Sequence, residues 1–274
     1  MLWTRFRRHR AGVIAVVLLA ISLFLACFGP RLAPFDPRHM SWDTLQSPGR
    51  NHPFGTDNLG RDVLSQVMHG IRSAMVVGLT AALVSTALGI TIGALAGSAG
   101  GSLDSLLMRF TDGFMVIPSF FVLLLVASIY GSSLLLIAIM IGLTTWPTTA
   151  RVVRMQFLAL REREFVTAAR ALGAGNARVV LRHLLPNALP SVIVMAALRG
   201  SGAILQEASL SFLGLGDPNI ISLGQMLMNA LQYMQLAWWP AVFPGFCIFV
   251  LVLAFNLFSD AMNDALNPRF ARRL

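Results

Sequence analysis

Six apolar stretches follow one another along this chain of 274 residues, with polar segments between them. They cover residues 11–28, 73–97, 110–130, 134–150, 188–209 and 241–258. A helix of roughly 18 or more apolar residues is long enough to cross the hydrocarbon core of a bilayer. The pattern predicts an all-α polytopic membrane protein with six transmembrane helices.

The segment 151–187 separates the fourth apolar stretch from the fifth and holds seven of the 21 arginines. Apolar residues at helical spacing predict a short helix over residues 164–172, namely Phe165, Ala168, Ala169 and Leu172. Gly173 and Gly175 are expected to end that helix. Asn176 is then expected to cap a second helix, and Pro186 to end it. Two short helices joined by a glycine turn predict a compact knob on one membrane face.

A mixed polar segment, residues 29–72, precedes the second apolar stretch, and its nearly balanced charge is compatible with the outer face. Asp57, Arg61 and Asp62 are expected to hold this segment together through local ion pairs, which is a structural role. Residues 62–72 are expected to form a helix at the membrane interface.

Composition excludes an ordinary soluble domain, because 56% of the residues are hydrophobic, only 12% are charged, and the mean hydropathy is +0.71. The net charge of +9 comes from arginine alone, since the chain has no lysine. A basic balance can indicate nucleic-acid binding. Here the arginines cluster beside apolar stretches, which indicates positive-inside topology instead. We therefore expect no nucleic-acid partner, and place both termini and the segment 151–187 in the cytoplasm.

The absence of lysine also excludes an ATP site of the Walker A type, which needs a lysine on the phosphates. No HExxH or GxSxG motif is present, so the chain alone is not expected to be an enzyme. Cys27 and Cys247 lie in apolar stretches, and the five histidines are scattered, so no metal site or bound cofactor is expected.

Features within the apolar stretches predict how the helices pack. Gly89, Gly93 and Gly97 recur every four residues and are expected to let a neighbouring helix approach closely. Pro118 predicts a kink in the third span. Trp146 is expected at the membrane interface, where tryptophan is enriched.

Three ionisable residues lie in or near the predicted spans, where such a group normally faces protein or water. Arg199 either faces a water-filled cavity or pairs with another protein chain. Glu207 near the outer end of its span is expected to form a gate or a structural bond. Asp112 is expected to pair locally with Arg109.

The segment EFVTAARALGAGNARVVLRHLLPN resembles the EAA motif of permease subunits in binding-protein-dependent ABC importers. Thr167 stands where that motif has glutamate, His183 stands where it has isoleucine, and the spacing to Gly173 and Pro186 is kept. Further stretches resemble the second, shorter permease of the dipeptide/oligopeptide/nickel family: FGTDNLGRDVLSQVMHGIR, LREREFVTAARALGA, EASLSFLGLG and AFNLFSDAMNDALNPRF.

The resemblance implies the type I ABC importer permease fold and a chain that forms half of a pore for short peptides in the bacterial or archaeal inner membrane. The implied partners are a homologous second permease, two ABC ATPases that hold ATP and Mg, an extracytoplasmic substrate-binding protein and the lipid bilayer. Residues implied in coupling to an ATPase are Phe165, Thr167, Ala168, Ala169, Arg170, Leu172, Gly173, Arg178, Leu185 and Pro186. Arginines of this loop also suit retention inside the cell and contact with anionic lipid. In the implied pore, Arg199 either lines the translocation cavity and meets a peptide carboxylate, or bonds to the second permease.

Two alternatives stay open at this point. The same family includes importers of nickel, metal chelates or other small solutes, and a self-contained secondary transporter would belong to a different class. The expected organisation is a basic N-terminus with the first span (1–28), an outer loop (29–72), a transmembrane core (73–260) with the coupling loop 151–187, and a basic tail (261–274).

Overall fold

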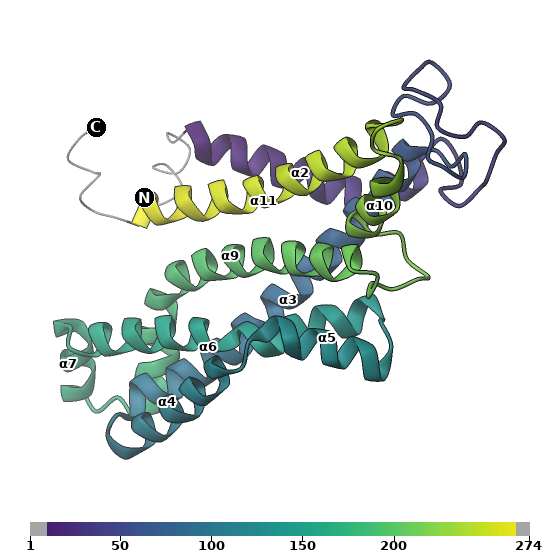
Figure 1. The fold of residues 1–274 in the computed structure, drawn as a ribbon. Coiled ribbons are helices and arrows are strands. Elements are labelled where there is room, and N and C mark those ends of the chain that lie inside the picture. Colours follow the sequence, from purple (N-terminus) through teal and green to yellow (C-terminus); the bar gives the residue numbers. More distant parts are fainter. Residues whose placement is uncertain (1–9, 267–274) are drawn as a thin grey trace.

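The computed structural model describes residues 10–266 and consists of helices joined by loops in that range (Figure 1). The helices are α2 (Arg10–Leu32), α3 (Val63–Ala99), α4 (Gly101–Val116), α5 (Ser119–Tyr130), α6 (Leu134–Arg161), α7 (Glu164–Ala171), α8 (Asn176–Val179), η1 (Val180–Leu184), α9 (Leu185–Phe212), α10 (Leu223–Ala230), η2 (Leu231–Tyr233) and α11 (Trp239–Leu266). The basic segment 1–9 and the tail from residue 267 lie outside the described residues.

Five of these helices are long and apolar enough to cross a membrane, and the bent pair α4–α5 makes up to six spans. The prediction of an all-α polytopic membrane protein is confirmed. The kink expected at Pro118 is also present, because α4 and α5 meet there at 69°. The helical part of this span starts at Gly101, ahead of the predicted apolar stretch 110–130, so that boundary was wrong.

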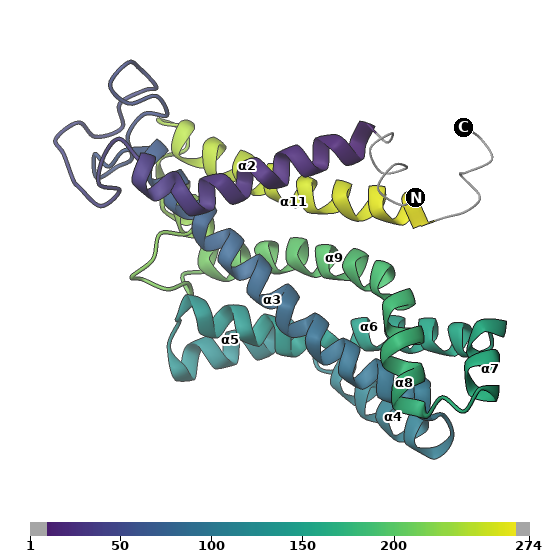
Figure 2. The same cartoon turned by 180° about the vertical axis from the view of Figure 1, so that it is seen from behind.

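The long helix α3 crosses between two groups of helices (Figures 1 and 2). On one side α2 and α11 run next to each other, and on the other lie α4, α5 and α6, with α9 packed against α3 and α11. The start of α2, the end of α11 and α7 lie at one end of the molecule. Residues 33–62 and α10 lie at the opposite end.

The segment 29–72 does not contain a separate interfacial helix, because residues 63–72 are the first turns of the 37-residue helix α3. Asp62 caps this helix by accepting from Ser65 N at 2.8 Å and from Ser65 Oγ at 2.7 Å. Gln66 in the first turns is buried and donates to Asp57 Oδ2 at 3.0 Å. These hydrogen bonds satisfy the polar side chains of Asp62 and Gln66, so this part of α3 does not need contact with water at a membrane interface.

Two further boundary predictions were wrong. The helix α6 continues to Arg161, beyond the apolar stretch that ends at residue 150. Within it Trp146 is only 4% exposed and its ring lies 5.5 Å from that of Phe114, so it packs between helices. Pro186 does not end the second helix of the loop, because α8, η1 and α9 form one continuous rod from Asn176 to Phe212. The N-cap of that rod is Gly175 with no side-chain bond, so Asn176 is its first residue rather than its cap.

Candidate coupling surface and transport path

The predicted knob at residues 164–178 is present and begins with the helix α7. Gly173 N donates to Arg170 O at 2.9 Å and Ala174 N donates to Ala169 O at 3.0 Å. This bond pair is the Schellman arrangement that ends a helix with a residue at positive φ. Gly173 has φ +83°, a conformation that costs glycine nothing and other L-residues substantially.

The inner side of the knob is built into the protein. Val166 of α7 is 0% exposed, and Val179 and Leu184 are buried beside it. The same apolar cluster contains Phe157 of α6 and Val192 of α9. Close packing therefore links α7 to the C-terminal part of α6 and the N-terminal part of α9.

The outer side of the knob presents apolar groups to the surroundings. Phe165 is 42% exposed and Leu172 is 89% exposed. The other residues implied in coupling are Thr167, Ala168, Arg170, Gly173, Arg178 and Pro186, which are exposed, and Ala169 and Leu185, which are half-buried. Arg170 and Arg178 form no ion pair with another described residue. The sequence pattern grouped Phe165 with the apolar face, but Val166 is the residue that anchors the helix.

Pro186 follows a π-helical turn that makes room for it. Leu185 N donates to Val180 O, a bond that spans five residues, and Pro186 then occupies the first turn of α9. Proline has no N–H and is tolerated at that position. The ring of His183, within the π turn, lies 6.4 Å from that of Phe165, so the two halves of the knob meet at these side chains.

The three glycines of α3 lie against α6. A Cβ atom built on Gly89 would lie 2.6 Å from Thr149 Cβ, and one on Gly93 would lie 2.4 Å from Ala150 O. A Cβ on Gly97 would lie 2.6 Å from Phe157 Cβ. Any side chain at these positions would force the two helices apart.

Two ion pairs join α4 to α6 beside the knob. Arg154 donates to both carboxylate oxygens of Asp104, at 2.5 and 2.6 Å. Arg151 Nη2 donates to Asp112 Oδ1 at 2.5 Å, so the expected pairing of Asp112 with Arg109 was wrong. Sequence reasoning missed the Asp104 pair because its partners are fifty residues apart and no local spacing links them.

The two intramembrane charges have different environments. Glu207 is 2% exposed and accepts from Ser211 Oγ at 2.6 Å. Arg199 is half-buried, and its Nε atom has no hydrogen-bond partner among the described residues. The structure does not bring Arg199 and Glu207 together in an ion pair. An unpartnered guanidinium in a membrane helix requires a group from water, solute or another chain.

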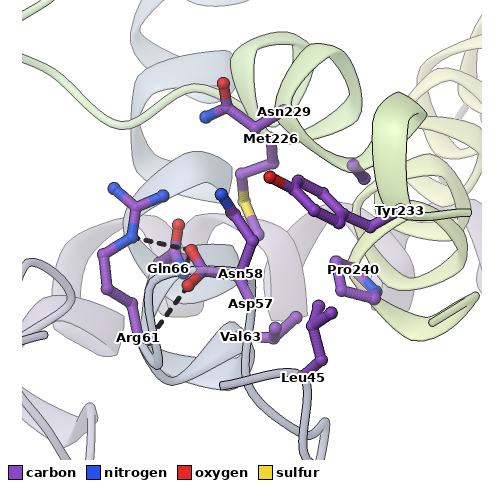
Figure 3. A pocket seen from close by; sticks show the side chains of 11 residues that line it. Leu45, Asp57, Asn58, Arg61, Val63, Gln66, Met226, Asn229, Tyr233 and Pro240 are labelled. Carbon is purple, nitrogen blue, oxygen red and sulfur yellow. Dashed lines mark hydrogen bonds and ion pairs between the residues drawn. The ribbon is translucent and has the colours of Figure 1, made fainter. Parts of the chain in front are cut away.

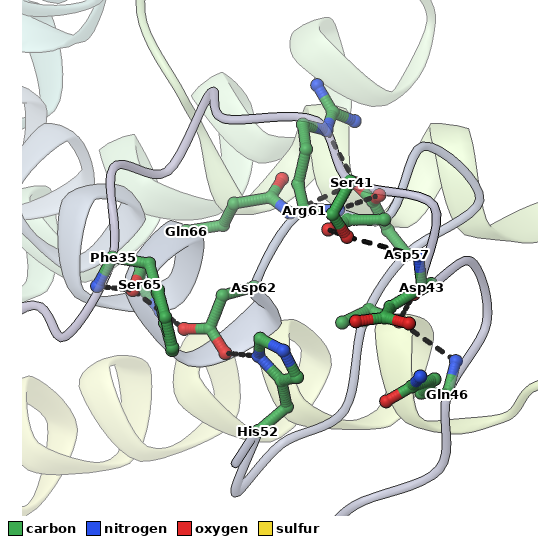
Figure 4. Close-up of polar contacts among 12 residues, drawn as sticks. Phe35, Ser41, Asp43, Gln46, His52, Asp57, Arg61, Asp62, Ser65 and Gln66 are labelled. Atoms are coloured by element: carbon green, nitrogen blue, oxygen red, sulfur yellow. Dashed lines mark hydrogen bonds and ion pairs between the residues drawn. The ribbon is translucent and has the colours of Figure 1, made fainter.

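The segment 33–62 is held by a dense polar network, which sequence reasoning expected in part. Arg61 Nε donates to Asp57 Oδ2 at 2.7 Å, which confirms the predicted local pair (Figure 3). Asp62 accepts from Ser65 on one side and lies 2.9 Å from His52 Nδ1 on the other (Figure 4). Trp239 Nε1 at the start of α11 donates to Thr56 O at 3.0 Å. The space among Asp57, Val63 and Tyr233 measures only about 10 Å³, so this network is packed and leaves room for about one water.

Comparisons with known proteins identify the family of this chain. A family model described as binding-protein-dependent transport system inner membrane component matches residues 89–272. The chain belongs to this family. A second model, described as the N-terminal TM domain of oligopeptide transport permease C, matches residues 1–53. The family consists of transport subunits, so the predictions of a transporter permease and against an enzyme are confirmed.

Relatives match this permease over nearly its whole length. A putative peptide permease protein of Brucella abortus is 38% identical over 269 residues, covering 97% of this chain and 89% of the relative. The dipeptide transport system permease protein DppC of Alkalihalophilus pseudofirmus is 35% identical, with coverage of 97% and 88%. The oligopeptide transport system permease protein OppC of Haemophilus influenzae is also 35% identical, with coverage of 97% and 86%. These relatives and the apolar helices confirm a multi-pass protein of the bacterial inner membrane.

A solved structure shows the same fold. A chain of the MetNI methionine ABC transporter in inward-facing conformations matches with a TM-score of 0.57 at 21% identity, covering 76% of this permease and 95% of that chain. At this identity the likeness establishes the fold and carries nothing about the solute. The predicted importer permease fold is confirmed.

Proposed function

We propose that this permease forms half of a pore that imports short peptides, and that it is driven by ATP hydrolysis on separate ATPase subunits. The names of its relatives support peptides as the solute, because several of them are dipeptide, oligopeptide or putative peptide permeases. A homologous second permease completes the pore, two ATPases hold ATP and Mg, and an extracytoplasmic binding protein delivers the peptide.

The knob at residues 164–178 carries the coupling in this proposal. Its inner side is fixed to α6 and α9 through Val166 and Val179, while Leu172 stands almost fully exposed on the outer side. This two-sided construction is the observation that supports the proposal most strongly, because a helix that transmits force needs one face in the protein and one for the partner. The exposed Arg170 and Arg178 favour a partner groove with acidic edges.

The orientation in the membrane follows from the same proposal. The knob lies at the same end of the molecule as the start of α2 and the end of α11 (Figure 1). ATPases are cytoplasmic, so both ends of the described chain face the cytoplasm, and residues 33–62 with α10 face outward. The core then comprises residues 73–260 and the coupling loop residues 151–187, with α3 reaching beyond the core to Val63.

The residues within the membrane have two proposed roles. Gly89, Gly93 and Gly97 pack α3 on α6 and keep that contact rigid. Arg199 lies along the translocation path, where its half-buried side chain meets solute or the second permease. Glu207 supports the outer end of α9 through its bond to Ser211.

Reconstitution tests the solute. The complete transporter in proteoliposomes should take up a labelled dipeptide only with ATP inside and the binding protein outside, and uptake should vanish when this chain is omitted. Nickel supplied with the same binding protein should not accumulate. ATP-dependent accumulation of nickel or a metal chelate, with no peptide uptake, would assign the transporter to the metal-importing branch instead.

A surface variant tests the coupling. Leu172→Ser changes an exposed side chain and should leave insertion intact while lowering peptide-stimulated ATP hydrolysis and uptake together. Leu236→Ser is the matched control, because Leu236 is also strongly exposed but lies just before α11 at the opposite end. Full activity of Leu172→Ser would exclude the exposed face of the knob from coupling.

A further inference from the structure

Two adjoining cavities open at the outer end of the permease. One has a volume of about 640 Å³ and the other about 280 Å³, and both are lined by Arg38, Ile220 and Ile221. The segment after α2, the first turns of α3 and the loop before α10 form their walls. We call the two together the outer vestibule. The volume of the larger cavity falls in the range of about 300–1,000 Å³ that is typical of small-molecule sites.

The vestibule carries more positive than negative charge. Arg38 and Arg72 line the larger cavity, and neither forms an ion pair with another described residue. The one acid in its lining is Asp36, whose Oδ1 already accepts from Arg38 N at 2.9 Å. Arg61 lines the smaller cavity, where its Nε binds Asp57 and its two terminal nitrogens point away from that carboxylate (Figure 3).

The guanidinium of Arg38 is held at the opening of the vestibule by a backbone carbonyl group. Arg38 Nη2 donates to Asn219 O, which fixes the side chain across the mouth between the outer segment and the loop before α10. His69 is oriented in the same wall, since its Nδ1 lies 2.9 Å from Ser65 O. A carbonyl oxygen only accepts, so Nδ1 carries the proton and the other ring nitrogen is an acceptor.

The remaining walls match the other parts of a peptide. Gln66, Gln225 and Asn229 line the smaller cavity, and side-chain amides both donate to and accept from peptide groups. Val76, Leu134 and Ile220 give the larger cavity an apolar wall that suits an uncharged side chain. Cationic, amide and apolar groups thus surround one connected space.

We propose that the outer vestibule binds the C-terminal carboxylate of a short peptide between Arg38 and Arg72, an inference that rests on peptides being the solute. Guanidinium groups form paired, charge-assisted hydrogen bonds with carboxylates. Every linear peptide with a free end carries this group whatever its sequence, so a site of this kind accepts many peptides. The vestibule is therefore the first site on the permease that the peptide occupies after it leaves the binding protein.

Uptake by the complete transporter in proteoliposomes tests the site with two solutes, the dipeptide Ala-Ala and its C-terminal amide. Arg72→Gln and Arg38→Gln should each lower the uptake rate of the free acid by about tenfold to a hundredfold at limiting solute, because a charged hydrogen-bond pair is lost. Uptake of the amide should stay at its wild-type value. Arg50→Gln is the control, since Arg50 is an exposed arginine of the same outer segment that does not line the vestibule.

The outcomes separate this proposal from the function on which it rests. Equal loss of acid and amide uptake in Arg72→Gln would overturn the carboxylate site and assign Arg72 to assembly or to lipid headgroups. Wild-type uptake of the free acid by both variants would overturn it as well. No uptake of either dipeptide by the wild-type transporter would contradict the proposed peptide function itself.

Photocrosslinking gives a direct readout that does not depend on how the binding protein treats the amide. A dipeptide with a free carboxylate and a benzophenone side chain is added to the purified complete transporter and irradiated. Label should appear on this chain at the vestibule in wild type and Arg50→Gln, and should be lost in Arg72→Gln. Label that persists in Arg72→Gln, or that never appears at the vestibule, contradicts the proposal.

Discussion

Gly173→Val is the substitution that tests the knob most sharply. Gly173 sits at φ +83°, where valine is sterically disfavoured, yet a Cβ built there would meet nothing within 4 Å. The added side chain has free space, so only the backbone conformation is disturbed. For an L-residue the left-handed conformation costs roughly 1–2 kcal/mol, and a branched Cβ increases that cost.

A penalty of about 1–2 kcal/mol shifts a local equilibrium by roughly 5- to 30-fold. In Gly173→Val this shift favours conformations in which the turn between α7 and α8 is open and the two helices no longer pack against each other. Gly175→Val is the matched control in the same turn, because Gly175 has φ −68° and a Cβ there also meets nothing within 4 Å. Gly173→Asn should fall between the two, since asparagine tolerates positive φ.

The assay is the number of peptides taken up per ATP hydrolysed by the complete transporter in proteoliposomes. Gly173→Val should insert normally and hydrolyse ATP with little uptake, whereas Gly175→Val should behave like wild type. Limited proteolysis should cut the loop faster in Gly173→Val alone. Wild-type coupling in Gly173→Val, or equal damage from both valine variants, would refute the assignment of the turn.

Two further predictions concern contacts of α6, and the apparent melting temperature of the purified protein in detergent measures both. Gly93→Leu should destabilise the fold by about 1–3 kcal/mol, because its side chain overpacks against Ala150. Gly113→Ala in α4 should not destabilise it, because a Cβ there meets nothing within 4 Å. Equal stability of the two variants would contradict the close contact between α3 and α6. Asp104→Asn should lower the free energy of unfolding by about 1–3 kcal/mol, because it breaks the paired bonds to Arg154. Asp112→Asn in the more exposed pair with Arg151 should lower it by only about 0–1 kcal/mol. The reverse order of the two losses would count against this assignment.

Much of the fold could be predicted because hydrophobic length and helical spacing are local properties. The apolar stretches marked the membrane helices, and the spacing around Ala168 with Gly173 marked α7 and its turn. The anchoring residue Val166 was not identified, because its burial depends on Phe157 and Val192 of other helices. A residue between two helical ridges gives no clear periodic signal when the helix is only eight residues long.

The remaining errors arose where tertiary contacts override a local rule. Gln66 is polar in sequence but buried in α3, since Asp57 satisfies its amide nine residues away. A proline usually marks a helix end because it has no N–H to donate. At Pro186 the helix continues, because the π turn before it shifts the hydrogen bonding so that Leu185 N donates to Val180 O. The arginines of the outer vestibule looked like scattered loop charges, because only the folded chain brings Arg38 to the same cavity as Arg72.

Cross-linking from position 172 tests the coupling role of the knob most directly. Leu172→Cys places a thiol at an 89% exposed site directly after α7. The helix α7 lies at the opposite end of the molecule from α10 (Figure 1). In the complete transporter, a short bifunctional reagent should join this cysteine to an ATPase subunit, the yield should change when ATP is bound, and the joined complex should stop importing peptide. Cross-linking to no ATPase subunit, or unchanged uptake by the joined complex, would contradict the claim that this surface couples ATP hydrolysis to transport.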